Sequence, residues 1–148
     1  MKKILITALI TLLGLQASFS AGAGWMTDFD AAKAKAQAEG KPMLLDFTGS
    51  DWCGWCIKLD EEVFSQPTFQ EYAEDAFVLV ELDFPRSKTQ SSELKAQNEA
   101  LARAYGIRGF PTILVLSPEG QLIEKTGYRR GGAEQYVEHL QQIIASAQ

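Results

Sequence analysis

Two cysteines, Cys53 and Cys56, are the only thiols of this 148-residue chain, and two residues separate them. They stand in the motif Trp-Cys-Gly-Trp-Cys, shortly after the apolar segment 43–47 and a Gly-Ser-Asp turn. Thiols at this spacing can close a small disulfide ring if the second lies one helical turn beyond the first. A helix that begins near Cys53 would therefore suit the pair to thiol–disulfide exchange.

The expected helix gives the two sulfur atoms different properties. In the first helical turn, free backbone N–H groups and the positive end of the helix dipole stabilise a thiolate, which lowers the pKa of Cys53 below the ~8.5 of a free cysteine. Cys56 falls on the apolar face with Leu59 and is expected to be buried. We therefore predict that Cys53 is an accessible nucleophile and that Cys56 is the resolving thiol.

Asp46 is the candidate proton acceptor for Cys56. It stands in an apolar strand otherwise made of Met, Leu and Phe. Desolvation raises the pKa of a carboxyl group in such surroundings, which suits it to proton exchange nearer neutral pH. Asp46 is thus the third predicted catalytic residue.

Two other interpretations of the cysteine pair remain open. The first is a static structural disulfide, although so small a ring removes little entropy from the unfolded chain. The second is half of a metal site, but zinc takes about four ligands and the chain adds only His139, far along the sequence. We favour redox use, and expect no bound metal or cofactor beyond the cysteine pair itself.

The motif Trp-Cys-Gly-Trp-Cys after a strand that carries an aspartate resembles the thioredoxin superfamily. A second motif, Tyr-Gly-Ile-Arg-Gly-Phe-Pro-Thr at 105–112, resembles the thioredoxin segment in which a cis proline opens a central strand beside the cysteines. Pro111 matches that proline. The resemblance implies that Phe110, just before it, pairs with an extended substrate peptide. Segment 41–67 is also similar to the C-terminal domain of transmembrane thiol:disulfide interchange proteins.

The chain departs from the thioredoxin pattern in the spacing before Cys53, at Glu81, and in the Gly-Trp pair between the cysteines, which is Gly-Pro in thioredoxin. Six residues separate Asp46 from Cys53, where thioredoxin has five. Glu81 stands near the place of a buried lysine of thioredoxin, and we expect it to face solvent. If it faced inward, its charge would raise the proton affinity of Asp46 further.

The tryptophans of the motif are candidate substrate-binding residues, together with Phe110 and Pro111. Trp55 lies between the two thiols at a helix start, so we expect it to be exposed and available to a substrate protein. Trp52 precedes the nucleophile and could also be a core aromatic. Asp51 is expected to cap the active helix.

The N-terminus has the layout of a secretory signal peptide over residues 1–23: Met-Lys-Lys, an apolar run, then small residues. Cleavage is expected after residue 20 or 23. The alternative, an uncleaved anchor, is disfavoured because the apolar run falls short of the ~20 residues that span a bilayer. The protein is therefore expected to be exported, periplasmic or extracytoplasmic, with no stable membrane insertion after cleavage.

Residues 24–148 are enough for one domain. Without the two N-terminal lysines the formal charge moves from −5 to −7, which disfavours nucleic acid as a partner. Helices are expected over 28–40, 52–64, 67–72, 92–106 and 136–144, and strands over 43–48, 77–82, 112–116 and 121–126. This order predicts a thioredoxin-like three-layer α/β/α sandwich with a central mixed sheet, whose first strand is short or missing.

The preferred functional hypothesis is an exported thiol–disulfide oxidoreductase that acts as a protein disulfide reductase or isomerase. It implies protein substrates with disulfides and a membrane-borne thiol electron donor. The alternatives are a non-catalytic thioredoxin-like binding module or chaperone, and a thiol reductase for cytochrome or metal-site maturation.

Overall fold

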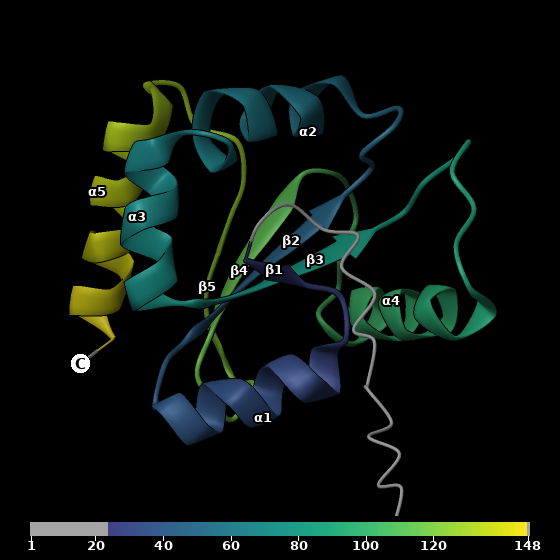
Figure 1. Cartoon of the computed structure of the whole chain (residues 1–148), viewed down its shortest axis with the longest axis horizontal. Helices are drawn as coiled ribbons and strands as arrows, with labels where there is room; N and C mark the ends of the chain where they lie inside the picture. Colours follow the sequence, from purple (N-terminus) through teal and green to yellow (C-terminus); the bar gives the residue numbers. More distant parts are fainter. Residues whose placement is uncertain (1–23, 148) are drawn as a thin grey trace, which may run out of the picture.

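The structure, a computed structural model, describes residues 24–147 (Figure 1). The expected signal peptide lies outside the described residues. The elements are, in chain order, β1 (Trp25–Met26), α1 (Phe29–Glu39), β2 (Met43–Thr48), α2 (Gly54–Leu59), the π-helical turn η1 (Asp60–Phe64), α3 (Pro67–Ala76), β3 (Val78–Asp83), α4 (Ser92–Ala104), β4 (Thr112–Leu116), β5 (Leu122–Thr126) and α5 (Gly132–Ser146). None of the helices in this part of the chain has the length and hydropathy needed to cross a membrane.

The five strands form one mixed sheet in the order β1-β3-β2-β4-β5. Strands β1 and β2 run parallel to β3, while β4 runs antiparallel to both β2 and β5. Strand β2 lies at the centre, and all six of its residues are buried. The first strand exists but has only two residues. The predicted thioredoxin-like mixed sheet is therefore confirmed.

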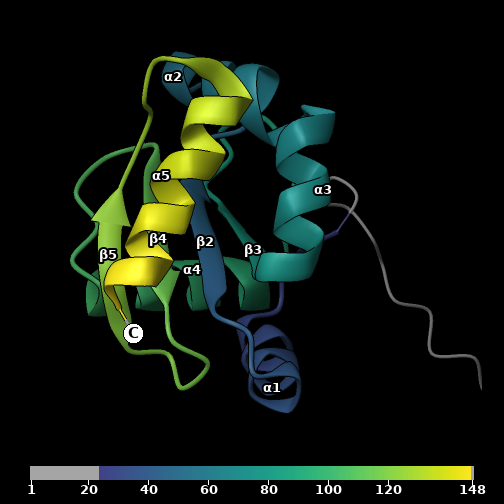
Figure 2. The ribbon, with the colours of Figure 1, turned by 90° about the vertical axis from the view of Figure 1, so that its left-hand side faces the viewer.

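Helices cover both faces of the sheet (Figures 1 and 2). On one face α1 and α4 pack over Met43, Leu45 and Phe47 of β2. On the other face α2, η1, α3 and α5 pack over Leu44. Because successive residues of a strand point to opposite faces, Asp46 shares the face of Leu44 and lies under α2, η1, α3 and α5.

The expected helix over 52–64 is divided in the structure. Cys53 is its N-cap, one residue outside the helix, so α2 begins at Gly54. The end widens into a π-turn in which the Ser65 N–H donates to the Asp60 carbonyl at 2.8 Å. The Ser65 hydroxyl also donates to the Asp60 carboxylate at 3.1 Å, which holds this wide turn together just before α3.

Candidate active site

The two cysteines lie at the end of β2, where a tight turn leads into α2. The N–H groups of Trp52 and Cys53 both donate to the Gly49 carbonyl, at 3.2 and 2.8 Å. Gly49 is needed there because a Cβ atom would lie 2.5 Å from the Trp52 ring. Cys53 is bonded to Cys56 in a disulfide, with a Cα–Cα distance of 5.2 Å. The expected placement of the second thiol one turn after the first is therefore confirmed.

Both cysteines are buried in this oxidised state. Cys53 is 7% exposed and Cys56 is 4% exposed. The expectation that Cys53 is openly accessible is wrong here, because its side chain folds back over the helix start. There its sulfur joins Cys56 and accepts a hydrogen bond from the Cys56 N–H at 3.3 Å. The same N–H is available to stabilise a thiolate at position 53.

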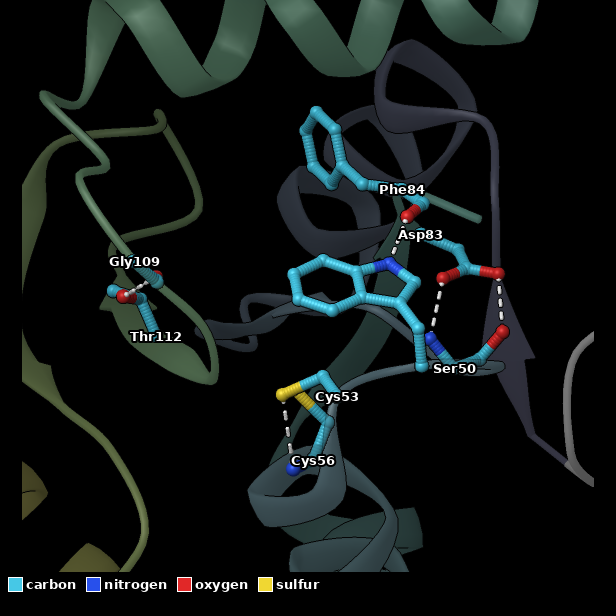
Figure 3. The surroundings of a disulfide bond; sticks show 8 residues. Ser50, Cys53, Cys56, Asp83, Phe84, Gly109 and Thr112 are labelled. Carbon is cyan, nitrogen blue, oxygen red and sulfur yellow. Dashed lines mark hydrogen bonds between the residues drawn. A yellow bond between two sulfur atoms is a disulfide. The ribbon is translucent and has the colours of Figure 1, made fainter. Parts of the chain in front are cut away.

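The predicted cis proline is present beside the disulfide. The Phe110–Pro111 peptide bond is cis, and β4 begins at the next residue. Thr112, the first residue of β4, pairs with Phe47 near the end of β2, so the proline and the cysteines share one end of the sheet. The aromatic rings of Trp52 and Phe110 meet edge to face, with centroids 5.9 Å apart. Figure 3 shows the disulfide together with Gly109 and Thr112, the residues on either side of the Phe110–Pro111 pair.

Asp46 is buried as predicted, and it is 8% exposed. Among the residues that the structure describes, its Oδ1 atom has no hydrogen-bond partner. The side chain lines a small cavity of about 60 Å³ together with Asp60 and Glu81. Burial raises the pKa of Asp46 well above its usual value, and the charges of Glu81, Asp60 and Asp83 raise it further, in that order. Asp46 therefore has the high proton affinity that a proton acceptor for a thiol requires.

Glu81 does not face solvent, so that expectation is wrong. It is half-buried on β3, directly opposite Asp46 of β2. Burial is the main cause that raises the pKa of Glu81 to about 7, and Asp83 adds to it. The parallel register is the reason: it places both carboxyl groups on the α2 face of the sheet. This structure thus has a pair of carboxyl groups on the sheet face that α2, η1, α3 and α5 cover, and both line the cavity beside η1.

Asp51 does not cap α2, which corrects another expectation. Its carboxylate accepts backbone N–H groups of Arg86, Ser87 and Lys88 at 2.9, 2.6 and 3.0 Å. These hydrogen bonds, with that of Arg86 first, lower the pKa of Asp51. The helix start is left to Cys53 itself. Asp51 instead binds the loop after β3 to the cysteine turn.

Further bonds tie the same loop to the turn. The Asp83 carboxylate accepts the N–H and the hydroxyl of Ser50, at 2.9 and 2.5 Å (Figure 3). The Trp52 indole donates to the Phe84 carbonyl at 2.7 Å. The Arg86 guanidinium lies over the Trp52 ring at 3.7 Å. Sequence reasoning missed these partners, because they lie more than 30 residues away and belong to a polar loop without a motif.

Trp55 is exposed as predicted, at 54%. It is not free on the surface, because its ring packs on Tyr128 with centroids 5.1 Å apart. The Lys58 ammonium lies over both rings, at 5.4 and 5.8 Å. The Tyr128 hydroxyl donates to Glu62 at 2.7 Å. Tyr128 was not foreseen, and its position just after the last strand is the only signal the sequence offers for it.

Comparison with known proteins identifies the family. Residues 29–144 match a family model described as a thioredoxin-like domain. The chain belongs to the thioredoxin-like family. It is 35% identical over 104 residues to the disulfide bond reductase DsbH of Chlamydia pneumoniae. The aligned region covers 70% of this chain and 63% of that protein. It is also 35% identical over 89 residues to the thiol:disulfide interchange protein DsbD of Salmonella typhi. This aligned region covers 60% of this chain and 14% of DsbD.

A solved structure titled DsbH oxidoreductase has the same arrangement of elements. It superposes with a TM-score of 0.80 at 30% identity, over 89% of this chain and 93% of that structure. The match to curated DsbH nevertheless spans less than two thirds of that relative's length. The sequence and structure comparisons thus agree on the family.

The chemistry available to this thioredoxin-like protein is that of the disulfide. Within residues 24–147 no group of three or more His, Cys, Asp or Glu side chains is arranged to hold a metal ion. The site combines a cysteine pair at a helix start, a cis proline at the same end of the sheet and a buried carboxyl group on the sheet face that α2, η1, α3 and α5 cover.

Proposed function

We propose that this thioredoxin-like protein is an exported thiol–disulfide oxidoreductase that reduces protein disulfides. The observation that carries the proposal is the Cys53–Cys56 disulfide at the start of α2, at the same end of the sheet as the cis Phe110–Pro111 bond. The likeness to the disulfide bond reductase DsbH favours reduction over oxidation as the direction. The structure corresponds to the oxidised state that a turnover leaves behind.

The reaction begins from the reduced dithiol. The Cys53 thiolate attacks one sulfur of a substrate disulfide, forming a mixed disulfide and releasing one substrate thiolate. Cys56 then loses its proton and attacks the Cys53 sulfur, so that the second substrate thiolate leaves and the 53–56 disulfide closes. The two thiolates released take up protons from water. Two electrons pass from the protein to the substrate.

Asp46 is the proposed acceptor of the Cys56 proton. A carboxylate with a raised pKa is a stronger base, and the burial of Asp46 supplies that rise. The cavity that it lines with Glu81 and Asp60 gives the proton a polar route away from the apolar core. Asp46→Asn is therefore expected to slow the attack of Cys56 on the mixed disulfide. The attack of Cys53 on the substrate would then be the faster of the two steps.

The substrate polypeptide is proposed to lie beside the disulfide against four side chains: Trp52, Trp55, Phe110 and Pro111. Phe110 precedes β4, where an extended peptide can pair with its backbone. Trp55 supplies exposed apolar area next to the sulfur atoms. The contact between Trp52 and Phe110 joins the cysteine turn to the peptide-binding segment.

Each turnover leaves an oxidised protein, so a reduced thiol donor must return two electrons to the disulfide. For an exported protein we propose a membrane-borne donor, because the compartment outside the cytoplasm is oxidising. The N-terminal layout supports export. N-terminal sequencing of the protein recovered from a periplasmic extract tests export. The expected result is a mature chain that begins at Ala21 or Gly24.

Insulin reduction tests the activity, with Cys53→Ser and Cys56→Ser as controls. The original protein should reduce insulin with dithiothreitol as donor, and both variants should fall to the uncatalysed rate. Cys56→Ser should in addition accumulate mixed disulfides with substrates, and Cys53→Ser should not. If the original protein reduces insulin no faster than either variant, catalysis is rejected and a non-catalytic binding role remains.

A further inference from the structure

The loops around the disulfide carry the opposite charge from the rest of the molecule. The described residues 24–147 have a formal charge of −7. We call four loops the active-site rim: 49–53, 84–91, 106–111 and 127–131. The rim holds five cations and one carboxylate, a formal charge of +4, and the remaining described residues hold seven cations and 18 carboxylates, a formal charge of −11. Positive charge is thus concentrated at the end of the sheet that carries the chemistry.

The topology explains why the four loops meet. Strands β2 and β3 are parallel, so the loops that follow them leave the sheet at the same end. Strand β4 is antiparallel to β2 and begins at that end, and β5 returns to it (Figure 1). Three contacts join the loops to the cysteine helix and its turn: Trp52 with Phe110, Trp52 with Arg86, and Trp55 with Tyr128.

The arginines of the rim are open to an incoming partner. Arg86, Arg108, Arg129 and Arg130 are all exposed. Between residues 24 and 147, none of the four forms an ion pair with a carboxylate. Arg86 is held over the Trp52 ring, close to the disulfide.

Three carboxylates near the disulfide accept hydrogen bonds or form an ion pair within the protein. Asp51 accepts three backbone N–H groups, and Asp83 accepts two hydrogen bonds from Ser50. Glu62, one turn and a half beyond the cysteines, accepts the Tyr128 hydroxyl and pairs with Lys58. Asp51 keeps its negative charge in these hydrogen bonds, and with that charge counted the active-site rim has a formal charge of +4.

We propose that the active-site rim selects polypeptides whose reactive cysteine is flanked by carboxylates. The inference rests on the proposed function and adds the chemistry of its substrate. Complementary charge raises the rate at which partners meet and orients them, and it disfavours partners of the same charge. The remaining described residues have a formal charge of −11, which counts the buried Asp46 and the half-buried Glu81 as ionised. Their net negative charge disfavours contact with an acidic partner elsewhere on the molecule, so such a partner is directed to the disulfide.

Three disulfide-linked peptides test the inference. They share one cysteine-containing core, and their flanks carry glutamates, lysines or neutral glutamines. The pre-reduced protein is mixed with each peptide without any other reductant, and released thiol is measured after acid quench. At about 20 mM salt the rate constant for the acidic peptide should exceed that for the basic peptide by about tenfold or more. At about 0.5 M salt, where screening acts within a few ångströms, the ratio should approach one.

Charge reversal on the rim provides the matched comparison. Arg129→Glu with Arg130→Glu brings the rim charge from +4 to zero and should abolish the preference. Arg108→Glu, on another loop, halves the rim charge and should reduce a tenfold ratio to about threefold. Lys33→Glu with Lys35→Glu makes the same change of net charge on α1, away from the disulfide, and should keep the ratio. A thermal melt checks that each variant is folded.

The outcomes separate the two proposals. Equal rates for the three peptides, or faster reduction of the basic peptide, overturn the rim's selectivity and leave the reductase intact. Failure to reduce any peptide overturns both. Vesicles of phosphatidylcholine and phosphatidylglycerol in equal parts test an anionic membrane as the alternative partner. If the protein binds these vesicles and reduces the three peptides at equal rates, the inference is overturned in favour of a membrane surface.

Discussion

Replacing Glu81 with glutamine should make the protein more stable at and above neutral pH and leave it unchanged in acid. Glu81 is half-buried opposite Asp46, and its pKa is raised from 4.5 to about 7. In the folded state it therefore holds its proton more tightly than in the unfolded chain. Glutamine has nearly the same shape, so the variant removes the ionisation while keeping the packing.

Proton linkage gives the sign and the size of the change in the free energy of unfolding. Below pH 4.5 the carboxyl group is protonated in both states, and it costs the folded state nothing through its charge. Between pH 4.5 and about 7 the folded state binds more protons than the unfolded state, so the free energy of unfolding falls as the pH rises. At about 1.4 kcal/mol for each pH unit, the loss reaches about 3 kcal/mol at pH 7 and stays constant above it.

Urea unfolding of the oxidised protein, followed by tryptophan fluorescence, measures the effect between pH 4.5 and 8.5. The difference in unfolding free energy between Glu81→Gln and the original protein should be close to zero at pH 4.5 and about 3 kcal/mol at pH 8. Glu61→Gln, on an exposed position of η1, is the matched control for the loss of one carboxyl group. If the difference in unfolding free energy between Glu81→Gln and the original protein is the same from pH 4.5 to 8.5, the pKa of Glu81 is not raised by its position beside Asp46.

Three further substitutions have expected results. Trp55→Ala should lower the rate on a protein disulfide about tenfold and leave the rate on a small disulfide unchanged, because the exposed ring contacts Tyr128 and solvent rather than the core; equal losses on both would contradict a docking role. Tyr136→Phe should lower the unfolding free energy by about 1–3 kcal/mol, since its buried hydroxyl donates to the Gly127 carbonyl at 3.1 Å, and calorimetry measures the change. Leu114→Ala, fully buried in β4, should cost about 2–5 kcal/mol in the same experiment, and a smaller loss would mean that the core closes over the cavity.

The parts of the fold that depend on nearby residues could be predicted from the sequence. The apolar run 43–48 became β2 with the expected bounds, and the strands expected over 112–116 and 121–126 became β4 and β5, which pair antiparallel across the short turn 117–120. Pro111 was placed by its motif, and its peptide bond is cis. In each case the signal is a run of side chains or a turn residue within a few positions of the element it controls.

The parts that depend on distant pairings could not be predicted. Asp51 stands before a helix with the residue type of a cap, and only the position of the loop after β3 shows that its carboxylate is used elsewhere. Cys53 was expected to be accessible because a thiolate nucleophile must be reached. Its burial follows from the closed disulfide, a state that the sequence does not specify.

Glu81 shows most clearly why local reasoning stops short at this site. Its side chain direction is set by which residue of β3 lies opposite Asp46, and a shift of one position would turn Glu81 toward α1 and α4 instead. Burying two like charges side by side lowers stability, so packing alone gives no reason for the pair. The proposed role of Asp46 as proton acceptor for Cys56 does give a reason, because the neighbouring charge raises the proton affinity of Asp46. The feature that costs the fold stability is thus the one that serves the proposed chemistry, which is where sequence rules for a stable core are expected to fail.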